Sequence, residues 1–106
     1  MARLSDDGTT VELDLHGEGV ADALALARRA LALCAQRGRR RLRLVHGAST
    51  SAPGVWTIRS ALHDWLDSGS ARAFYVSDER AEATLTLHLD LAARPDPRRL
   101  IARDVR

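Results

Sequence analysis

The sequence has no lysine, a single cysteine and no long run of apolar residues. One cysteine, Cys34, excludes an intramolecular disulfide and is typical of proteins that stay in the reducing cytoplasm. Every apolar run is shorter than the roughly 20 residues that a membrane-spanning helix needs. The first ten residues are polar and lack the apolar segment of a signal peptide. We therefore expect a cytoplasmic protein with no membrane partner.

Because lysine is absent, all 16 basic side chains are arginines, set against 14 acidic ones. A net charge of +2 does not by itself predict a polyanionic partner. The local distribution is more informative, because residues 37–43 hold the densest run of arginine. Guanidinium groups bind phosphates without reading bases, so this run favours salt-dependent binding of nucleic acid. The alternative is that these arginines only solvate a helix end and neutralise nearby acids.

The chain is long enough for one domain. We expect a flexible lead at residues 1–10, a folded domain at 11–91 and a basic tail, frayed or partly helical, at 92–106. Hydrophobic periodicity predicts strands at residues 11–16, 39–46, 72–77 and 83–89, helices at residues 20–36 and 55–67, and a charged turn at residues 78–80.

This order of elements predicts a two-layer α/β sandwich, βαβαββ, with two helices packed on one face of a mixed four-stranded sheet. The first two strands flank a helix, so we expect them to be parallel neighbours in a right-handed βαβ unit. The other face of the sheet is then open, and alternation along the strands assigns polar side chains to it. These side chains are Glu12, Asp14, His16, Arg41, Arg43, Thr84, Thr86 and His88.

The first strand ends in an acid and an imidazole. Because strand side chains alternate between faces, Asp14 and His16 are expected side by side on the open face. Gly17 follows them and permits a sharp turn that a residue with a Cβ would resist. His46 ends the next strand, which is expected to run parallel to the first, so it is expected at the same edge of the sheet.

These features resemble the Smr (small MutS-related) domain family over roughly residues 11–90. The resemblance rests on Leu13-Asp14-Leu15-His16-Gly17, the Ala/Leu helix, the basic strand ending in His46-Gly47, and Val55-Trp56-x-x-Arg59-x-x-Leu62-x-x-Trp65-Leu66. It implies a fold similar to the C-terminal domain of a bacterial translation initiation factor. It also implies binding of nucleic acid and, as in many members, endonucleolytic nicking of DNA or RNA. The family's proposed catalytic residues then fall on Asp14 and His16.

Two stretches depart from the family pattern. The usual His/Thr-Gly-x-Gly loop reads His46-Gly47-Ala48-Ser49 here, and a usual Gly-x-Gly near the last strand reads Ala81-Glu82-Ala83. Glycine lets backbone N–H groups approach a phosphate closely, so both departures weaken the expected phosphate site. They favour the alternative of a non-catalytic nucleic-acid-binding module. A further alternative is a protein-interaction domain that uses Trp56 and the wide apolar arc of the first helix.

Cleavage of a phosphodiester needs an activated water or hydroxyl and stabilisation of charge on the phosphoryl oxygens. Imidazole changes charge near neutral pH, which makes His16 the expected general acid or base, with Asp14 to orient it and His46 as a third member. No cofactor is assigned with certainty. A divalent cation held by this set is an open alternative, and no metal site is predicted. The structural alternative is that Glu12 and Asp14 merely pair with arginines across the strands.

A second set of residues is expected to contact the nucleic acid. The loop at 47–54 leads into a helix N-terminus, where free N–H groups and the helix dipole attract phosphate. An exposed tryptophan beside an arginine is the combination expected for stacking on an unpaired base, although the tail or a second subunit is an alternative cover for it. The set consists of Gly17, Arg41, Arg43, Gly47, Ser49, Thr50, Ser51, Trp56 and Arg59. The target, DNA or RNA, and the oligomeric state are not predicted.

Overall fold

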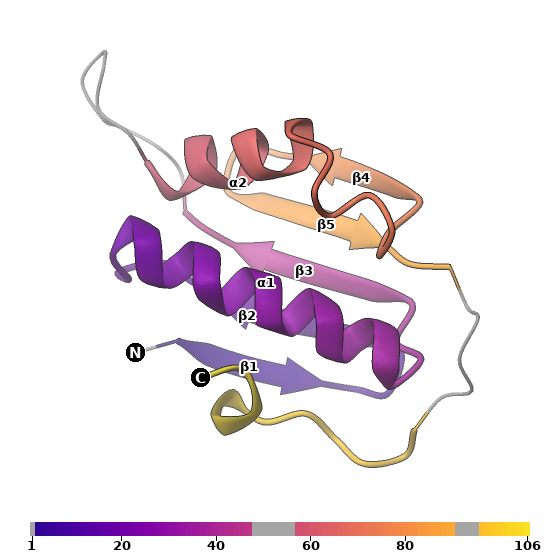
Figure 1. Cartoon of the computed structure of the whole chain (residues 1–106). Coiled ribbons are helices and arrows are strands. Elements are labelled where there is room, and N and C mark those ends of the chain that lie inside the picture. Colours follow the sequence, from indigo (N-terminus) through magenta and orange to yellow (C-terminus); the bar gives the residue numbers. More distant parts are fainter. Residues whose placement is uncertain (1, 48–56, 91–95) are drawn as a thin grey trace.

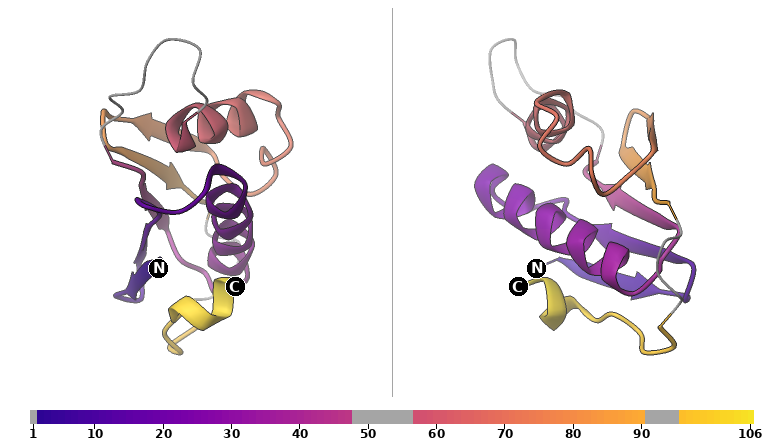
Figure 2. Two further views of the ribbon diagram at one scale, coloured as in Figure 1. Left: turned by 90° about the vertical axis from the view of Figure 1, so that its left-hand side faces the viewer. Right: turned by 45° about the vertical axis from the view of Figure 1, so that its right-hand side comes forward.

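A computed structural model describes residues 2–47, 57–90 and 96–106 of the chain. Its elements in order are β1 (Arg3–Asp6), β2 (Thr10–Asp14), α1 (Val20–Gln36), β3 (Arg41–Val45), α2 (Ile58–Asp67), β4 (Ser77–Arg80), β5 (Thr84–His88) and a short 3-10 helix, η1 (Ala102–Val105). The strands form one sheet in the order β1-β2-β3-β5-β4 (Figure 1). Both helices cover the same face of this sheet (Figure 2).

The alternation of side chains along the strands follows the sequence pattern. Leucine and valine from β2, β3 and β5 are fully buried beneath the helices, and they are Val11, Leu13, Leu42, Leu44, Leu85 and Leu87. Polar residues between them face the open side of the sheet. β2 and β3 are parallel, as the βαβ prediction requires, and the other neighbouring strands are antiparallel. The α/β sandwich with two helices on one face is therefore confirmed.

The predicted number of strands is wrong by one, because the sheet has five strands rather than four. Residues 3–6, expected as part of a flexible lead, form β1 and pair antiparallel with β2. This strand carries only one apolar residue, Leu4, which packs partly against the core. A hairpin turn at Gly8, with a φ of +95°, joins the two strands. Backbone pairing with β2 and buried polar contacts therefore hold β1, rather than hydrophobic alternation.

The position of β4 also differs from the prediction. Residues 72–77 were expected as a strand and 78–80 as a charged turn, but β4 is Ser77–Arg80 and the connection to β5 follows it. An edge strand tolerates charge because its outer side faces solvent, and acidic and basic residues there discourage pairing with other chains. The apolar residues before it lie outside the strand, where Phe74 and Val76 are exposed and only the Val76 N–H bonds to β5, donating to the His88 carbonyl at 2.8 Å.

The first helix matches its predicted bounds, residues 20–36. The second helix was expected from residue 55 but begins at Ile58, because Thr57 is extended and its side chain accepts a hydrogen bond from the Ser60 N–H as an N-cap. Within the described ranges, no helix has the length and apolarity needed to cross a bilayer.

Cys34 lies on the buried side of α1 and is fully inaccessible. Burial raises the pKa of its thiol to about 12, because the thiolate would lose its hydration. We expect a thiol-specific reagent such as 5,5′-dithiobis(2-nitrobenzoate) to react at pH 8 only as fast as the protein unfolds. The release of the coloured thiolate, measured with and without denaturant, checks this. Rapid labelling of the folded protein would contradict the described packing.

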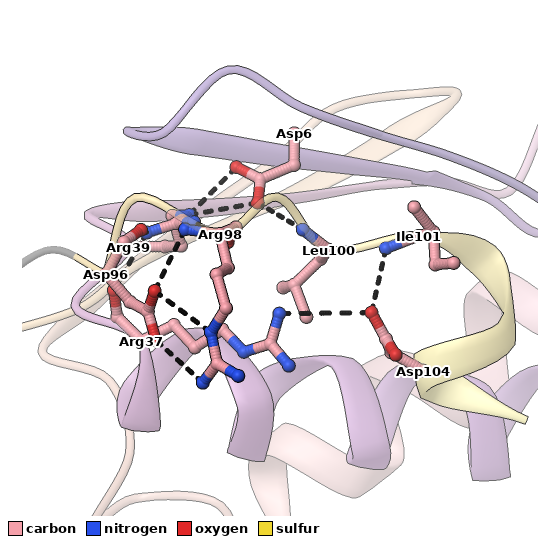
Figure 3. A network of polar contacts seen from close by, with 8 residues as sticks. All are labelled: Asp6, Arg37, Arg39, Asp96, Arg98, Leu100, Ile101 and Asp104. Atoms are coloured by element: carbon pink, nitrogen blue, oxygen red, sulfur yellow. Dashed lines mark hydrogen bonds and ion pairs between the residues drawn. The ribbon is translucent and has the colours of Figure 1, made fainter.

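A buried ion pair connects three segments that lie far apart in the sequence (Figure 3). The Arg39 side chain at the start of β3 donates from Nε to both carboxylate oxygens of Asp6, at 2.8 and 3.1 Å, and both side chains are fully buried. Its other nitrogens donate to the backbone carbonyls of Arg37, Asp96 and Arg98, at 2.6 to 2.8 Å. Arg39 was expected in a basic, solvent-facing run, so its burial corrects that expectation.

The Asp6 carboxylate collects further donors. The backbone N–H of Leu100 donates to it at 2.7 Å, and that of Gly8 at 2.8 Å. Burial on its own would raise the pKa of Asp6, but the hydrogen bonds from Arg39, Leu100 and Gly8 and the charge of Arg39 together lower it. The described part of the tail, 96–106, is therefore bound to the domain. Figures 1 and 2 show it beside β1 and α1.

Candidate catalytic and nucleic-acid site

The turn that follows β2 is held by its own polar groups. The Asp14 Oδ1 atom accepts a hydrogen bond from the backbone N–H of His16 at 3.0 Å, and the N–H of Glu18 donates to the Leu15 carbonyl at 3.1 Å. Gly17 has a φ of +86°, which is strained for any residue with a Cβ, so the expected role of glycine in this turn is confirmed. The turn therefore fixes the positions of Asp14 and His16 relative to each other.

The side chains of Asp14 and His16 are close together and reachable from solvent. The Nδ1 atom of His16 lies 3.5 Å from the Asp14 Oδ1 atom, and the two side chains are 74% and 36% exposed, respectively. A carboxylate at this distance favours a proton on Nδ1, so Nε2 is left with its lone pair on the side away from Asp14. The arrangement presents an oriented imidazole to a molecule bound at the sheet edge.

The end of β3 meets this turn. The Leu15 N–H donates to the Val45 carbonyl at 2.8 Å and extends the parallel pairing beyond the strands. Gly47 has a φ of +82°, and a Cβ placed on it would lie 3.8 Å from the Cβ of His16. The two motifs that are far apart in the sequence, at residues 13–17 and 46–47, therefore lie side by side in the fold.

His46 reaches the expected edge of the sheet, but its ring lies on the helical side. It is only 7% exposed, its Nδ1 contacts the Gly47 carbonyl at 2.8 Å, and its Nε2 has no partner among the described residues. Its ring packs edge-on against that of His63 in α2, with the centroids 6.5 Å apart. The described contacts thus bring Asp14 and His16 together, whereas His46 pairs with another histidine.

His63 in α2 was expected to be an ordinary surface histidine. The side chain is half-buried, and its Nε2 atom has no partner within the described ranges. Burial lowers the pKa of His63, and the positive charges of Arg80, Arg59 and His46 lower it further. Both rings of the histidine pair therefore lie close together with unpaired Nε2 atoms. Helical spacing alone predicts that residue 63 faces solvent. The contact is seen only in the fold, where the end of β3 lies beneath α2.

The open face carries Arg41 and Arg43, as predicted. The Arg43 Nε atom lies 3.9 Å from a Glu12 carboxylate oxygen, and the Arg41 Nε atom donates to the Thr10 hydroxyl at 3.1 Å. An exposed ion pair at such a distance contributes at most ~1 kcal/mol to stability. The Arg43 guanidinium can therefore exchange Glu12 for another partner. The cross-strand pairing that formed the structural alternative is therefore present for Arg43, in a weak form.

Other expected contacts fall partly outside the described residues. Ser49, Thr50, Ser51 and Trp56 belong to the segment 48–56, which the structure does not describe. Arg59 lies half-buried in the first turn of α2, next to His63. Within residues 2–47, 57–90 and 96–106, no group of three or more His, Cys, Asp or Glu side chains is placed to hold a metal ion.

Comparison with known proteins gives one match. The family model described as the Smr domain matches residues 13–84. No curated protein and no solved structure matches the chain significantly. The matched segment begins within β2 and ends at the start of β5, so it contains Asp14, His16, His46 and the cationic strand β3. It leaves out β1.

Proposed function

The chain belongs to the Smr domain family, and on that premise we propose that it binds nucleic acid at the open edge of its sheet and nicks the backbone there with Asp14 and His16. The observation that carries this proposal is the exposed contact between the two side chains, at 3.5 Å, beside the cationic strand β3. The His16 side chain is largely exposed and that of Asp14 is partly exposed. A sugar-phosphate chain thus has access to the imidazole from solvent.

The chemistry follows from the orientation of His16. Its Nε2 atom takes a proton from an attacking hydroxyl, either water or the 2′-hydroxyl of RNA. As the new P–O bond forms and the old one breaks, the leaving oxygen gains a proton from the imidazolium or from water. Asp14 keeps the ring oriented and stabilises its positive charge. Arg41 and Arg43 supply guanidinium groups on the same face to hold flanking phosphates.

A divalent cation stays an open part of the proposal. Asp14 and His16 offer one oxygen and one imidazole nitrogen, fewer ligands than a cation held by protein alone needs, so water or phosphate oxygens would complete its shell. No step of this chemistry depends on a metal ion.

The cytoplasmic location is a prediction that rests on the single cysteine, which is free.

One observation favours the second candidate, a non-catalytic nucleic-acid-binding module. The N–H groups of His46 and Gly47 both donate to the Ala83 carbonyl, at 3.0 and 3.1 Å, so these donors are already used inside the protein. A phosphate would have to find other backbone donors. The sequence Ala48-Ser49, where the family pattern has a second glycine, points the same way. Binding in this case would rely on arginine.

The test is an assay of the purified full chain on supercoiled plasmid and on structured RNA. Each is incubated with magnesium, with manganese and with EDTA, and products are resolved on gels. Relaxed plasmid or discrete RNA fragments support the nuclease. A mobility shift without new products supports the binding module. The absence of both at low salt would favour the protein-interaction domain and contradict the proposal.

A further inference from the structure

The strand β1 brings a cation to the candidate site from outside the family match. In the antiparallel pairing of β1 with β2, Arg3 is the direct partner of Asp14. Directly paired residues on one face of a sheet have Cβ atoms about 5 Å apart, so these two side chains leave the sheet next to each other. Arg3 is exposed, and so it stands at the same open edge as the acid–imidazole pair.

The charge of Arg3 is not paired within the part of the chain that the structure describes. Among the described residues, no ion pair or hydrogen bond joins its guanidinium to any group. Its nearest acid by register, Asp14, instead accepts the N–H of His16 and lies by the imidazole. By contrast, Arg43 on β3 is the register partner of Glu12 and lies 3.9 Å from its carboxylate. Arg3 is therefore the less compensated of these two cations on the open face.

The backbone of β1 is anchored on both sides of Arg3. Asp6 ends β1 and is held by Arg39 and by the Leu100 N–H, and Ala2 is buried against the core. The backbone on both sides of Arg3 is thus anchored, while its side chain remains in solvent. A residue on a fixed backbone whose exposed guanidinium has no described hydrogen bond or ion pair is suited to bind an anion that approaches this end of the sheet.

We propose that Arg3 is a substrate-binding residue of this site, which contacts a backbone phosphate of the nucleic acid next to the one attacked at His16. The proposal rests on the nucleic-acid function argued above and adds to it a contact that the family match does not contain. Arg3 on β1 lies opposite Asp14, and Arg43 on β3 lies opposite Glu12, two residues earlier on the same face of β2. A nucleic-acid chain that contacts both arginines would therefore cross β1, β2 and β3 on the open face (Figure 1). Arg3 acts in binding and positioning, not in proton transfer.

The test measures binding separately from cleavage. Fluorescence anisotropy with labelled single-stranded and hairpin RNA and DNA is performed on His16→Ala protein, so that no substrate is lost. Adding Arg3→Gln to this background is expected to weaken binding roughly tenfold at low salt and to reduce the slope of log affinity against log salt by about one. Arg3→Lys should retain most of the affinity, because a phosphate contact needs charge more than the planar fork.

A matched control removes the same charge elsewhere. Arg29→Gln, on the exposed side of α1 in the helical layer, should leave the affinity and the salt slope unchanged. An equal loss in Arg3→Gln and Arg29→Gln, or no loss in Arg3→Gln, overturns the proposal. Thermal melting of all variants should be the same, since Arg3 has no described partner.

Cleavage assays with intact His16 distinguish this inference from the function on which it rests. Arg3→Gln should raise KM about tenfold and leave kcat within about twofold, in line with a uniform binding contact. If the parent cuts but Arg3→Gln binds and cuts as well as the parent, the inference alone fails. If nothing is cut but binding depends on Arg3, the nuclease alone fails. If the parent does not bind, both fail.

Discussion

Replacing His16 with alanine is expected to lower the rate of phosphodiester cleavage by about 10²- to 10⁴-fold, which is the usual contribution of a general acid or base. Binding should change little, because within the described ranges the only polar contact of the exposed imidazole is with Asp14. Single-turnover cleavage of an end-labelled substrate and anisotropy on the same substrate separate the two quantities. Asp14→Asn should give a smaller loss, since the imidazole remains but its orientation and charge are less well supported.

Asp90→Asn provides the matched control. Asp90 is an exposed carboxylate just beyond the end of β5, at the opposite edge of the sheet, so removing its charge should leave cleavage unchanged. Equal cleavage by the parent and by His16→Ala would mean that another residue performs the chemistry or that a contaminant does. The histidine pair His46 and His63 would be the next place to look, because both have a buried Nε2 atom without a described partner.

Removing the charge of Asp6 is expected to destabilise the protein by about 3–5 kcal/mol, the usual cost of leaving one member of a buried ion pair without its partner. The total free energy of unfolding of a domain is about 5–15 kcal/mol, so Asp6→Asn should shift the denaturation midpoint strongly. Urea titrations followed by circular dichroism measure this. The double variant with Arg39→Leu should lose less than the sum of the two single variants, because the lone buried charge is gone.

Low pH should weaken the same ion pair between Asp6 and Arg39. The pKa of Asp6 is lowered in the fold below its ordinary value of 3.8, so its contribution to stability is fully present above that value and is lost as pH falls through the folded pKa. The parent should therefore lose stability steeply below about pH 4, and Asp6→Asn should lose less over the same range. Equal acid sensitivity of the two proteins would show that other carboxylates account for the loss.

The exposed pair formed by Asp67 and Arg80 serves as the control for burial. Its N–O distance, 2.8 Å, equals that between Arg39 and Asp6, but the Asp67 side chain is 62% exposed. Asp67→Asn should thus have a far smaller effect on the denaturation midpoint. If both substitutions cost the same, burial is not what makes the Asp6 contact strong.

The layout of the core was predictable because the pattern of each short segment determines which of its residues are buried. Alternation along β2, β3 and β5 and the apolar arc of α1 each appear within one short segment, and the structure follows them. The adjacency of Asp14 and His16 was predictable for the same reason, because it depends only on strand alternation and on the turn at Gly17. The sequence also contains a local signal for β1. Asp7-Gly8 is a common hairpin turn, and Gly8 has the positive φ that such a turn requires.

Long-range contacts account for most of what the sequence did not reveal. Nothing near Arg39 in the chain distinguishes it from Arg40 or Arg41, and only its partners at positions 6, 96 and 98 explain why it is buried. The meeting of His46 and His63 depends on where α2 crosses the end of β3. The position of Arg3 beside Asp14 depends on the register of a strand held by those same distant partners.

The network at Arg39 also bears on the order in which the chain assembles. The Asp6 carboxylate bonds the Leu100 backbone across a separation of 94 residues, so this contact closes nearly the longest loop the molecule contains. During synthesis, this contact can form only after residue 100 has been released. Until then, β1 is held by its hairpin pairing with β2, and Arg39 lacks the carbonyl acceptors that Asp96 and Arg98 supply. Late docking of the final residues would thus be the slow, topology-limited step of folding.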